Sequence, residues 1–145
     1  MDIQTLRRNS AAAAEGRWVD DIPSMPGVRL RVRGASSLAA VNCRRKKERQ
    51  VEKKDRERGG GFKPEVEQRI AREVLHEAVL LEWDGMTNGA DPLPYDFDIA
   101  GQFLLNPDFD AFAGAVTWAA AAVDQDNSEA ADDEAGNSKR QSSGK

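Results

Sequence analysis

The chain has 145 residues, of which 39% are hydrophobic, 6% aromatic and 32% charged, a composition that fits one ordinary domain with a modest core. Its single cysteine, Cys43, excludes an internal disulfide and a zinc site of several thiolates, and its single histidine, His76, removes most routes to acid–base catalysis. The net charge of −4 is unevenly spread, because residues 1–83 carry 18 basic and 13 acidic side chains, whereas residues 84–138 contain no lysine or arginine.

The first part of the chain predicts a small β element. Polar residues and alanines dominate residues 1–16, so we expect a flexible N-terminal segment there. In residues 28–33, apolar side chains alternate with arginines, which predicts a strand with one apolar face. Its expected partner is a strand at residues 18–19, across a loop rich in proline and glycine.

A charged helix is predicted for residues 37–58. Ser36 or Ser37 can cap its start, because a serine oxygen accepts a hydrogen bond from an amide of the first turn. Residues 44–58 are rich in lysine and arginine and almost free of apolar side chains. Opposite charges four residues apart would stabilise an exposed helix there by ~0.3 kcal/mol for each pair. The glycines at residues 59–61 end the helix.

Three more helices are predicted, over residues 64–83, 96–105 and 107–123. The first has the strongest signal, because a proline at its start precedes apolar residues spaced three and four apart. Asp96 and Asn106 are expected to cap the other two.

Alanines are the only apolar residues in residues 124–145, so we expect this acidic segment to be a disordered tail. The predicted fold is therefore α+β and predominantly α-helical, with a small N-terminal β element, about four helices and a disordered C-terminal tail. Residues 17–123 form the single expected domain.

The candidate chemical sites are incomplete. His76 lies between Glu73 and Glu77, but the second histidine of a metalloprotease helix is missing four residues further on. Cys43 precedes two arginines, which predicts a lowered thiol pKa, yet no histidine lies near it in the sequence. No carboxylate spacing matches a calcium loop, and no glycine pattern matches a nucleotide-binding loop. We therefore expect no enzyme activity, no catalytic residue, no bound metal and no cofactor.

Three segments in the second half of the chain follow one another in a recognisable order. Residues 73–85, EVLHEAVLLEWDG, precede a loop that closes in residues 93–96, LPYD, and a short helix leads into residues 104–109, LLNPDF. This order resembles the small tail assembly chaperones of long-tailed bacteriophages, in which a Trp-x-Gly element and Leu-Pro-Tyr-Ser commonly precede Leu-Leu-x-x-Pro-x-Phe. The strand at residues 27–33 is similar to one near the N-terminus of that family. The resemblance covers about residues 17–123.

The resemblance implies a non-enzymatic role in the assembly of a phage tail. Members of the family bind the tape-measure protein, a long and largely helical chain, and keep it soluble until subunits of the major tail tube protein replace them. It also implies a location in the cytoplasm of the host bacterium and absence from the mature virion. Many members have a longer form made by ribosomal frameshifting, so a longer form of this chain is a further candidate partner. Neither a membrane nor a nucleic acid is expected as a partner.

Four apolar residues are candidates for binding a protein partner: Trp83, Leu93, Pro94 and Tyr95. They lie at the end of a predicted helix and in the loop after it, where apolar side chains can stay exposed and bind another protein. Packing of this loop against the core is the alternative interpretation.

A second function remains open for the basic helix at residues 44–58. Its lysines and arginines would contact the phosphates of DNA or RNA and bind them in a salt-dependent way. Interleaved acidic residues, and the lack of any aromatic residue between Trp18 and Phe62 that could stack on a base, count against it. A small nucleic-acid-binding phage protein is therefore the alternative to the tail assembly chaperone.

Overall fold

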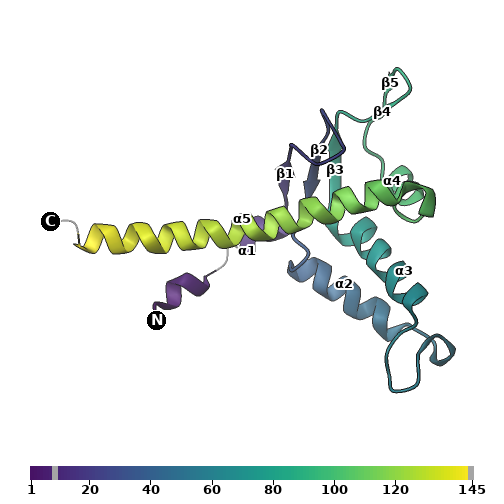
Figure 1. Cartoon of the computed structure of the whole chain (residues 1–145), viewed down its shortest axis with the longest axis horizontal. Coiled ribbons are helices and arrows are strands. Elements are labelled where there is room, and N and C mark those ends of the chain that lie inside the picture. Colours follow the sequence, from purple (N-terminus) through teal and green to yellow (C-terminus); the bar gives the residue numbers. More distant parts are fainter. Residues whose placement is uncertain (8–9, 144–145) are drawn as a thin grey trace.

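In the computed structural model, a three-stranded antiparallel sheet stands against a long C-terminal helix, and two shorter helices extend from its other end (Figure 1). The structure describes residues 1–7 and 10–143, without the side chains of residue 12 and of residues 127–143. The helices are α1 (Ser10–Glu15), α2 (Leu38–Arg49), α3 (Pro64–Val74), α4 (Phe97–Leu104) and α5 (Asp110–Ser143). The strands are β1 (Arg17–Val19), β2 (Arg29–Val32), β3 (Leu80–Asp84), β4 (Thr87–Asn88) and β5 (Asp91–Pro92). The fold is α+β and predominantly helical, as predicted.

The predicted N-terminal β element is present and gains a third strand. The strands β1 and β2 pair antiparallel, with Val19 opposite Leu30, and β2 also pairs with β3, with Leu30 opposite Trp83. Leu30 and Val32 are fully buried, as the alternation of apolar and basic residues predicts. The arginines of β2 face outward, where Arg29 lies 3.3 Å from Asp84 and stacks over the ring of Trp18.

The single helix predicted for residues 64–83 is wrong over its last part. The helix α3 ends at Val74, a π-helical turn spans Leu75–Val79, and β3 begins at Leu80. Val32 pairs with Leu80 and its neighbour pairs with Glu82, so one residue of β3 is left without a partner in the ladder. Such a bulge lets residues three apart face the same side of a strand. This spacing also occurs on a helix, which is why the pattern was misleading.

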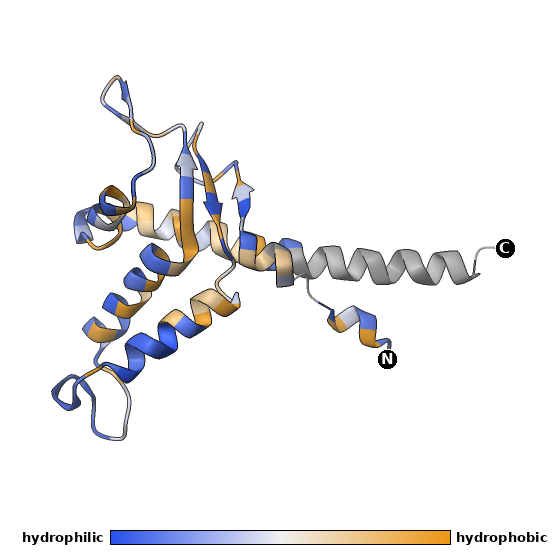
Figure 2. Cartoon of the chain, turned by 180° about the vertical axis from the view of Figure 1, so that it is seen from behind, coloured by the Kyte–Doolittle hydropathy of each residue, from blue (hydrophilic) through white to orange (hydrophobic). Residues whose placement is uncertain are grey.

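The charged helix predicted for residues 37–58 is also too long, because α2 ends at Arg49. Its cap is confirmed: the Ser37 hydroxyl oxygen accepts a hydrogen bond of 3.3 Å from the amide of Ala40. Beyond α2 the chain folds back, and the amide of Lys63 donates to the carbonyl of Asp55. Val51, the one apolar residue of the run, joins the core in this turn. Figure 2 shows a hydrophobic start and a hydrophilic end of α2.

The predicted helices around residues 96–105 and 107–123 are present as α4 and α5, and both caps are confirmed. The carboxylate of Asp96 accepts a hydrogen bond from the amide of Ile99, and the side chain of Asn106 accepts one from the amide of Asp108. A single 3₁₀ turn, Pro107–Phe109, leads into α5.

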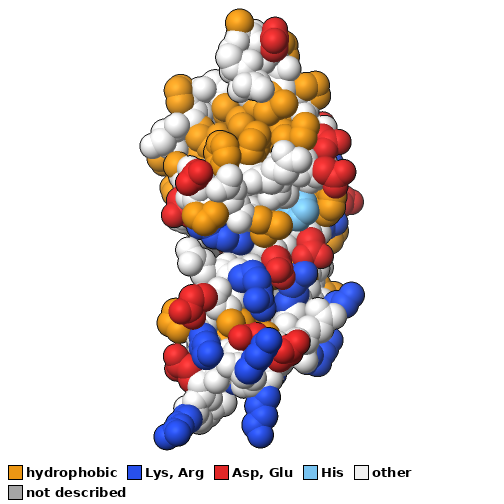
Figure 3. Space-filling view, turned by 90° about the vertical axis from the view of Figure 1, so that its right-hand side faces the viewer, with side chains coloured by type: hydrophobic (Ala, Val, Ile, Leu, Met, Phe, Trp, Pro, Cys, Tyr) orange, Lys and Arg blue, Asp and Glu red, His pale blue; other side chains and the backbone are white. Residues whose placement is uncertain are grey.

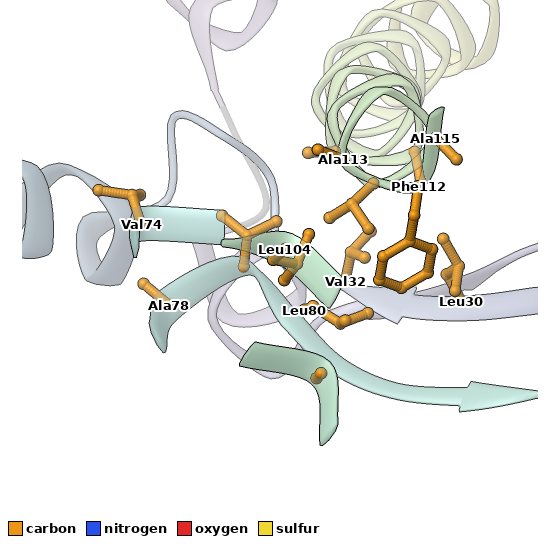
Figure 4. Close-up of a cluster of buried hydrophobic side chains, with 14 of the residues drawn as sticks. Leu30, Val32, Val74, Ala78, Leu80, Leu104, Phe112, Ala113 and Ala115 are labelled. Atoms are coloured by element: carbon orange, nitrogen blue, oxygen red, sulfur yellow. The ribbon is translucent and has the colours of Figure 1, made fainter. Parts of the chain in front are cut away.

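The core lies between the sheet, α3, α4 and the first half of α5. Figure 4 shows Phe112 of α5 pointing at β2, where its ring lies beside Leu30 and Val32. Further along α5, Val116 and Val123 are fully buried. The helix α5 therefore closes the core over the sheet.

Residues near both ends of the described chain contact the central domain. Within the predicted flexible segment, residues 1–16, Ala13 is buried and the carbonyl of Ala14 accepts a hydrogen bond of 2.7 Å from Nε of Arg33. At the other end, α5 continues to Ser143 instead of ending near residue 123, and the carboxylate of Asp124 accepts hydrogen bonds from Ser36. Of the disordered tail predicted for residues 124–145, the side chains from residue 127 onward lie outside the described residues. None of the described helices has the length and the apolar character that crossing a membrane requires.

Candidate protein-docking groove

Trp83 is a buried residue that holds the loop carrying the other three candidate partner-binding residues. Its side chain is only 4% exposed, and its Nε1 donates a hydrogen bond of 2.8 Å to the carbonyl of Leu93. The ring of Tyr95 packs edge-on against it, with 5.0 Å between the centroids. Leu93 and Tyr95 are half-buried and Pro94 is exposed. For Trp83, the structure thus matches the interpretation in which the loop packs against the core.

An open apolar groove of about 590 Å³ lies beside this loop, and we call it the apolar groove. Three parts of the chain form it: the turn between β1 and β2, the segment of β4 and β5, and the junction between α4 and α5. Its apolar lining consists of Met25, Met86, Leu93, Phe103, Phe109, Ala111 and Phe112, and its polar lining of Ser24, Thr87, Asn88 and Asp108. Of the four candidate residues, only Leu93 lines it.

The floor of the apolar groove is a cluster of aromatic rings. The rings of Phe103 and Phe109 lie 4.8 Å apart, and Phe112 packs edge-on against Phe103 and against Trp83, at 6.0 Å in both cases. Because Trp83 and Phe112 are buried in the core, the floor is anchored to the sheet and to α5. Phe109, in contrast, is 42% exposed. The groove thus presents one partly exposed aromatic residue above a buried aromatic base.

Backbone hydrogen bonds fix the two walls of the groove. The amide of Leu93 donates to the carbonyl of Met86 at 2.9 Å, which closes the loop that contains β4 and β5. The amide of Met25 donates to the carbonyl of Ile22 at 3.1 Å and shapes the opposite turn. One wall presents Met86 and the other Met25, and methionine is a side chain that adapts to irregular apolar surfaces. The sequence contains the clue of closely spaced phenylalanines at 103, 109 and 112, but helical periodicity alone assigned these to a buried stripe.

Charges divide the face that contains the groove into two ends. Figure 3 shows an apolar surface below the hairpin of β4 and β5, bordered mainly by acidic side chains, while lysines and arginines gather at the other end. Asp108 lines the groove itself and is exposed. The division follows directly from the sequence, because residues 84–138 contain no lysine or arginine.

His76 packs against the start of α4. Its Nε2 lies 2.8 Å from the carbonyl oxygen of Phe97, and its ring stacks on that of Phe97 with 4.1 Å between centroids. The ring also fills the space beside Gly101, where any Cβ would collide with it. Among the described residues, no group of three or more histidine, cysteine or carboxylate side chains could hold a metal ion. The contacts of His76 are therefore those of a packing residue.

The lowered pKa predicted for the Cys43 thiol is wrong, because the structure raises it. Burial is the main cause, and the carboxylate of Glu77 adds to it. The charges that act on the thiol are those of Glu77 and Glu73, which raise its pKa, and of Lys47 and Lys46, which lower it.

We expect Cys43 to react with iodoacetamide at pH 8 more slowly than the same cysteine in a short unstructured peptide. The thiolate is the reactive form, so a raised pKa lowers its fraction at a given pH and moves the midpoint of the pH–rate curve upward. Glu77→Gln should increase the rate without exposing the sulfur, because it removes a carboxylate that raises the pKa. Mass spectrometry of the alkylated protein measures both rates. Equal rates for the wild-type protein and for Glu77→Gln would show that burial alone raises the pKa of the thiol.

The basic run at residues 44–58 is partly neutralised within the molecule. Nζ of Lys47 lies 3.2 Å from a carboxylate oxygen of Glu73 and also contacts Glu77, and these hydrogen bonds raise the pKa of Lys47. Arg56 donates to the carbonyl of Glu48 and stacks over the ring of Phe62. The run is thus a helix followed by a folded loop rather than one basic helix.

Comparison with known proteins points to a phage origin. A family model described as YdaY prophage protein matches residues 35–137. This range begins before α2 and ends within α5, and it includes every residue that lines the apolar groove except Ser24 and Met25. No curated protein matches the chain. No solved structure matches it either.

Proposed function

We propose that this chain, which belongs to the family of YdaY prophage proteins, is an assembly chaperone of a phage tail. In this role it binds the tape-measure protein through the apolar groove and keeps that long chain soluble until subunits of the major tail tube protein replace it. The observation that carries the proposal is the open groove lined by methionine and phenylalanine on a rigid aromatic floor.

The size and lining of the groove support the binding of a protein segment. The groove of about 590 Å³ is open, and most of the side chains that line it are apolar. Exposed apolar surface rimmed by polar residues marks protein-interaction sites in general. Met25 and Met86 on opposite walls suit a client that offers several different apolar segments in turn.

The remaining surface suits a chaperone that keeps an aggregation-prone client dispersed. The chain carries a net charge of −4, and a net charge of one sign opposes the association of protein complexes in solution. The proposed role places the protein in the cytoplasm of the host bacterium during tail assembly and not in the mature virion. A longer frameshifted form would add a second binding segment and raise the avidity for the same client.

The alternative function, binding of DNA or RNA by residues 44–58, has weaker support from the geometry. Lys47 and Arg56 are engaged with carboxylates, a carbonyl and an aromatic ring of the same chain. Binding of phosphates would have to displace these contacts, and each phosphate contact would add to the salt dependence. Residues 44–58 are better explained as a charged surface that includes ion pairs to α3 and to the π-helical turn after it.

We expect co-expression with the tape-measure protein of the same prophage to move that client from the pellet into the soluble fraction, bound to this chain. Phe109→Ala should reduce the soluble fraction several-fold, because it removes the exposed aromatic residue of the groove. Phe97→Ala is the matched control, since Phe97 is 49% exposed but lies outside the groove lining. Quantitative gel analysis of the soluble fraction and co-purification measure the effect. A client that remains insoluble with the wild-type chain would refute the proposed function.

A further inference from the structure

We propose that the apolar groove selects a basic amphipathic helix, in which lysines or arginines flank the apolar side chains that enter the groove. The inference names the chemistry of the bound segment and rests on the proposed function only for the identity of the client. Three observations carry it: how the groove is built, which charges border it, and which of these charges are already paired.

The groove is built to receive side chains rather than to extend a sheet. The short strands β4 and β5 at its wall pair with each other, Thr87 opposite Pro92 and Asn88 opposite Asp91, and are only two residues long. Strand addition requires a longer free edge, whereas an amphipathic helix inserts apolar residues spaced three and four apart into a groove. The open aromatic floor with Phe109 at its edge fits the second mode.

The border of the groove is acidic, and two of its carboxylates are not paired. Asp108 lines the groove and Asp91 lies on β5 in the adjacent wall, and neither forms an ion pair among the described residues. The nearby cations are engaged elsewhere, because Arg29 pairs with Asp84 and Arg72 pairs with Asp110. A border of this kind attracts a basic segment and repels an acidic one.

Specificity would thus come from charge, and affinity from apolar contact. Phe109 and the two methionines offer little discrimination between apolar partners, since apolar pockets distinguish similar side chains weakly. The unpaired carboxylates add the repulsive element that excludes acidic helices.

The test uses the full chain and two synthetic helical peptides with the same leucine and phenylalanine face. One peptide carries lysines on its polar face and the other glutamates, and fluorescence anisotropy measures their binding. We expect the lysine peptide to bind at least about tenfold more tightly at low salt, with the difference shrinking as salt screens the charges. Phe109→Ala should weaken the binding of both peptides, and Phe97→Ala should change neither.

A charge-neutralising pair of variants isolates the acidic border. Asp108→Asn should weaken the lysine peptide by roughly two- to fivefold, the range for an exposed charge pair, and leave the glutamate peptide unchanged or slightly tighter. Asp98→Asn is the matched control, because Asp98 is also exposed in a first helical turn but lies outside the groove lining. Circular dichroism confirms that each variant is folded.

Equal binding of the two peptides, or binding that does not depend on Phe109, would overturn the inference. A wild-type dimer that Phe109→Ala converts to a monomer in sedimentation, with neither peptide bound, would also overturn it and assign the groove to a second copy. A soluble tape-measure complex combined with no preference for the lysine peptide would refute the inference and leave the proposed function standing. Preference for the lysine peptide without a soluble tape-measure complex would support the inference and refute the proposed function.

Discussion

Trp83→Ala is expected to lower the free energy of unfolding by ~3–5 kcal/mol, the range for removing a large aromatic side chain from a core. The indole lies between the sheet and the groove floor, and it contacts Tyr95, Phe103 and Phe112. Its Nε1 hydrogen bond to the carbonyl of Leu93 disappears as well, which frees the loop that forms one wall of the groove. Urea denaturation followed by far-UV circular dichroism measures the change.

Two variants separate the contributions of Trp83. Trp83→Phe keeps a ring in the cluster and loses the hydrogen bond, so it should cost less than the alanine variant while still weakening peptide binding in the groove. Trp118→Ala is the matched control, because Trp118 is 43% exposed on α5, and it should change the stability by less than ~1 kcal/mol. Similar losses for Trp83→Ala and Trp118→Ala would contradict the assignment of Trp83 to the core.

Gly85→Ala is expected to destabilise the protein by more than ~2 kcal/mol and to distort the apolar groove. Gly85 has a φ of +85°, which costs a residue with a Cβ about 1–2 kcal/mol. In addition, a Cβ at this position would overlap the carbonyl oxygen of Gly27, so the backbone itself must move. The overlap pushes apart the two segments that carry Met25 and Met86, the opposite walls of the groove.

Gly89→Ala provides the comparison that isolates this collision. Gly89 also has a positive φ, +63°, but a Cβ there would meet no atom within 4 Å. The difference in unfolding free energy between the two variants therefore reports the contact with Gly27, and only Gly85→Ala should weaken binding of the lysine peptide. Equal losses of stability would show that the backbone conformation alone accounts for the effect.

The features that could be predicted from the sequence are those that neighbouring residues determine. Ser37, Asp96 and Asn106 cap the helices as expected, because an N-cap depends only on a side chain and the amides that follow it. The strand at residues 28–33 is present as β2, since strict alternation has few other interpretations. Gly85, which follows β3, has a positive φ, a conformation that glycine adopts at little cost.

The sequence-based predictions that are wrong have a common cause, which is contact between segments that are distant in the sequence. The residues after Val79 join a sheet because β2 offers an edge and a bulge accommodates their three-residue spacing. The helix α2 ends early while Val51 enters the core, although local ion pairs would favour a longer helix. In both places packing outweighs a local preference of a few tenths of a kcal/mol.

For the same reason, only one edge of the apolar groove could be predicted from the sequence. Of the four candidate residues, Leu93 lines the apolar groove that we propose as the docking surface, whereas Trp83 is buried beneath it. The other walls come from residues near 25 and 109, which are far apart in the sequence. No local pattern indicates that the side chain of Phe109 stays partly exposed, because its exposure depends on where α5 lies against the sheet.

The position of α5 over β2 also sets how long the chain must wait before it can fold. Leu30 and Val116 belong to one core, and the ribosome adds about 5–20 residues per second, so about 4–17 s separate the synthesis of the two residues. For much of this interval β2 lacks both β3, which pairs with its edge, and α5, which packs against its apolar side. A protein proposed to protect another chain from aggregation thus passes through an aggregation-prone stage of its own. Slow translation between these segments would prolong that stage, and fast translation would shorten it.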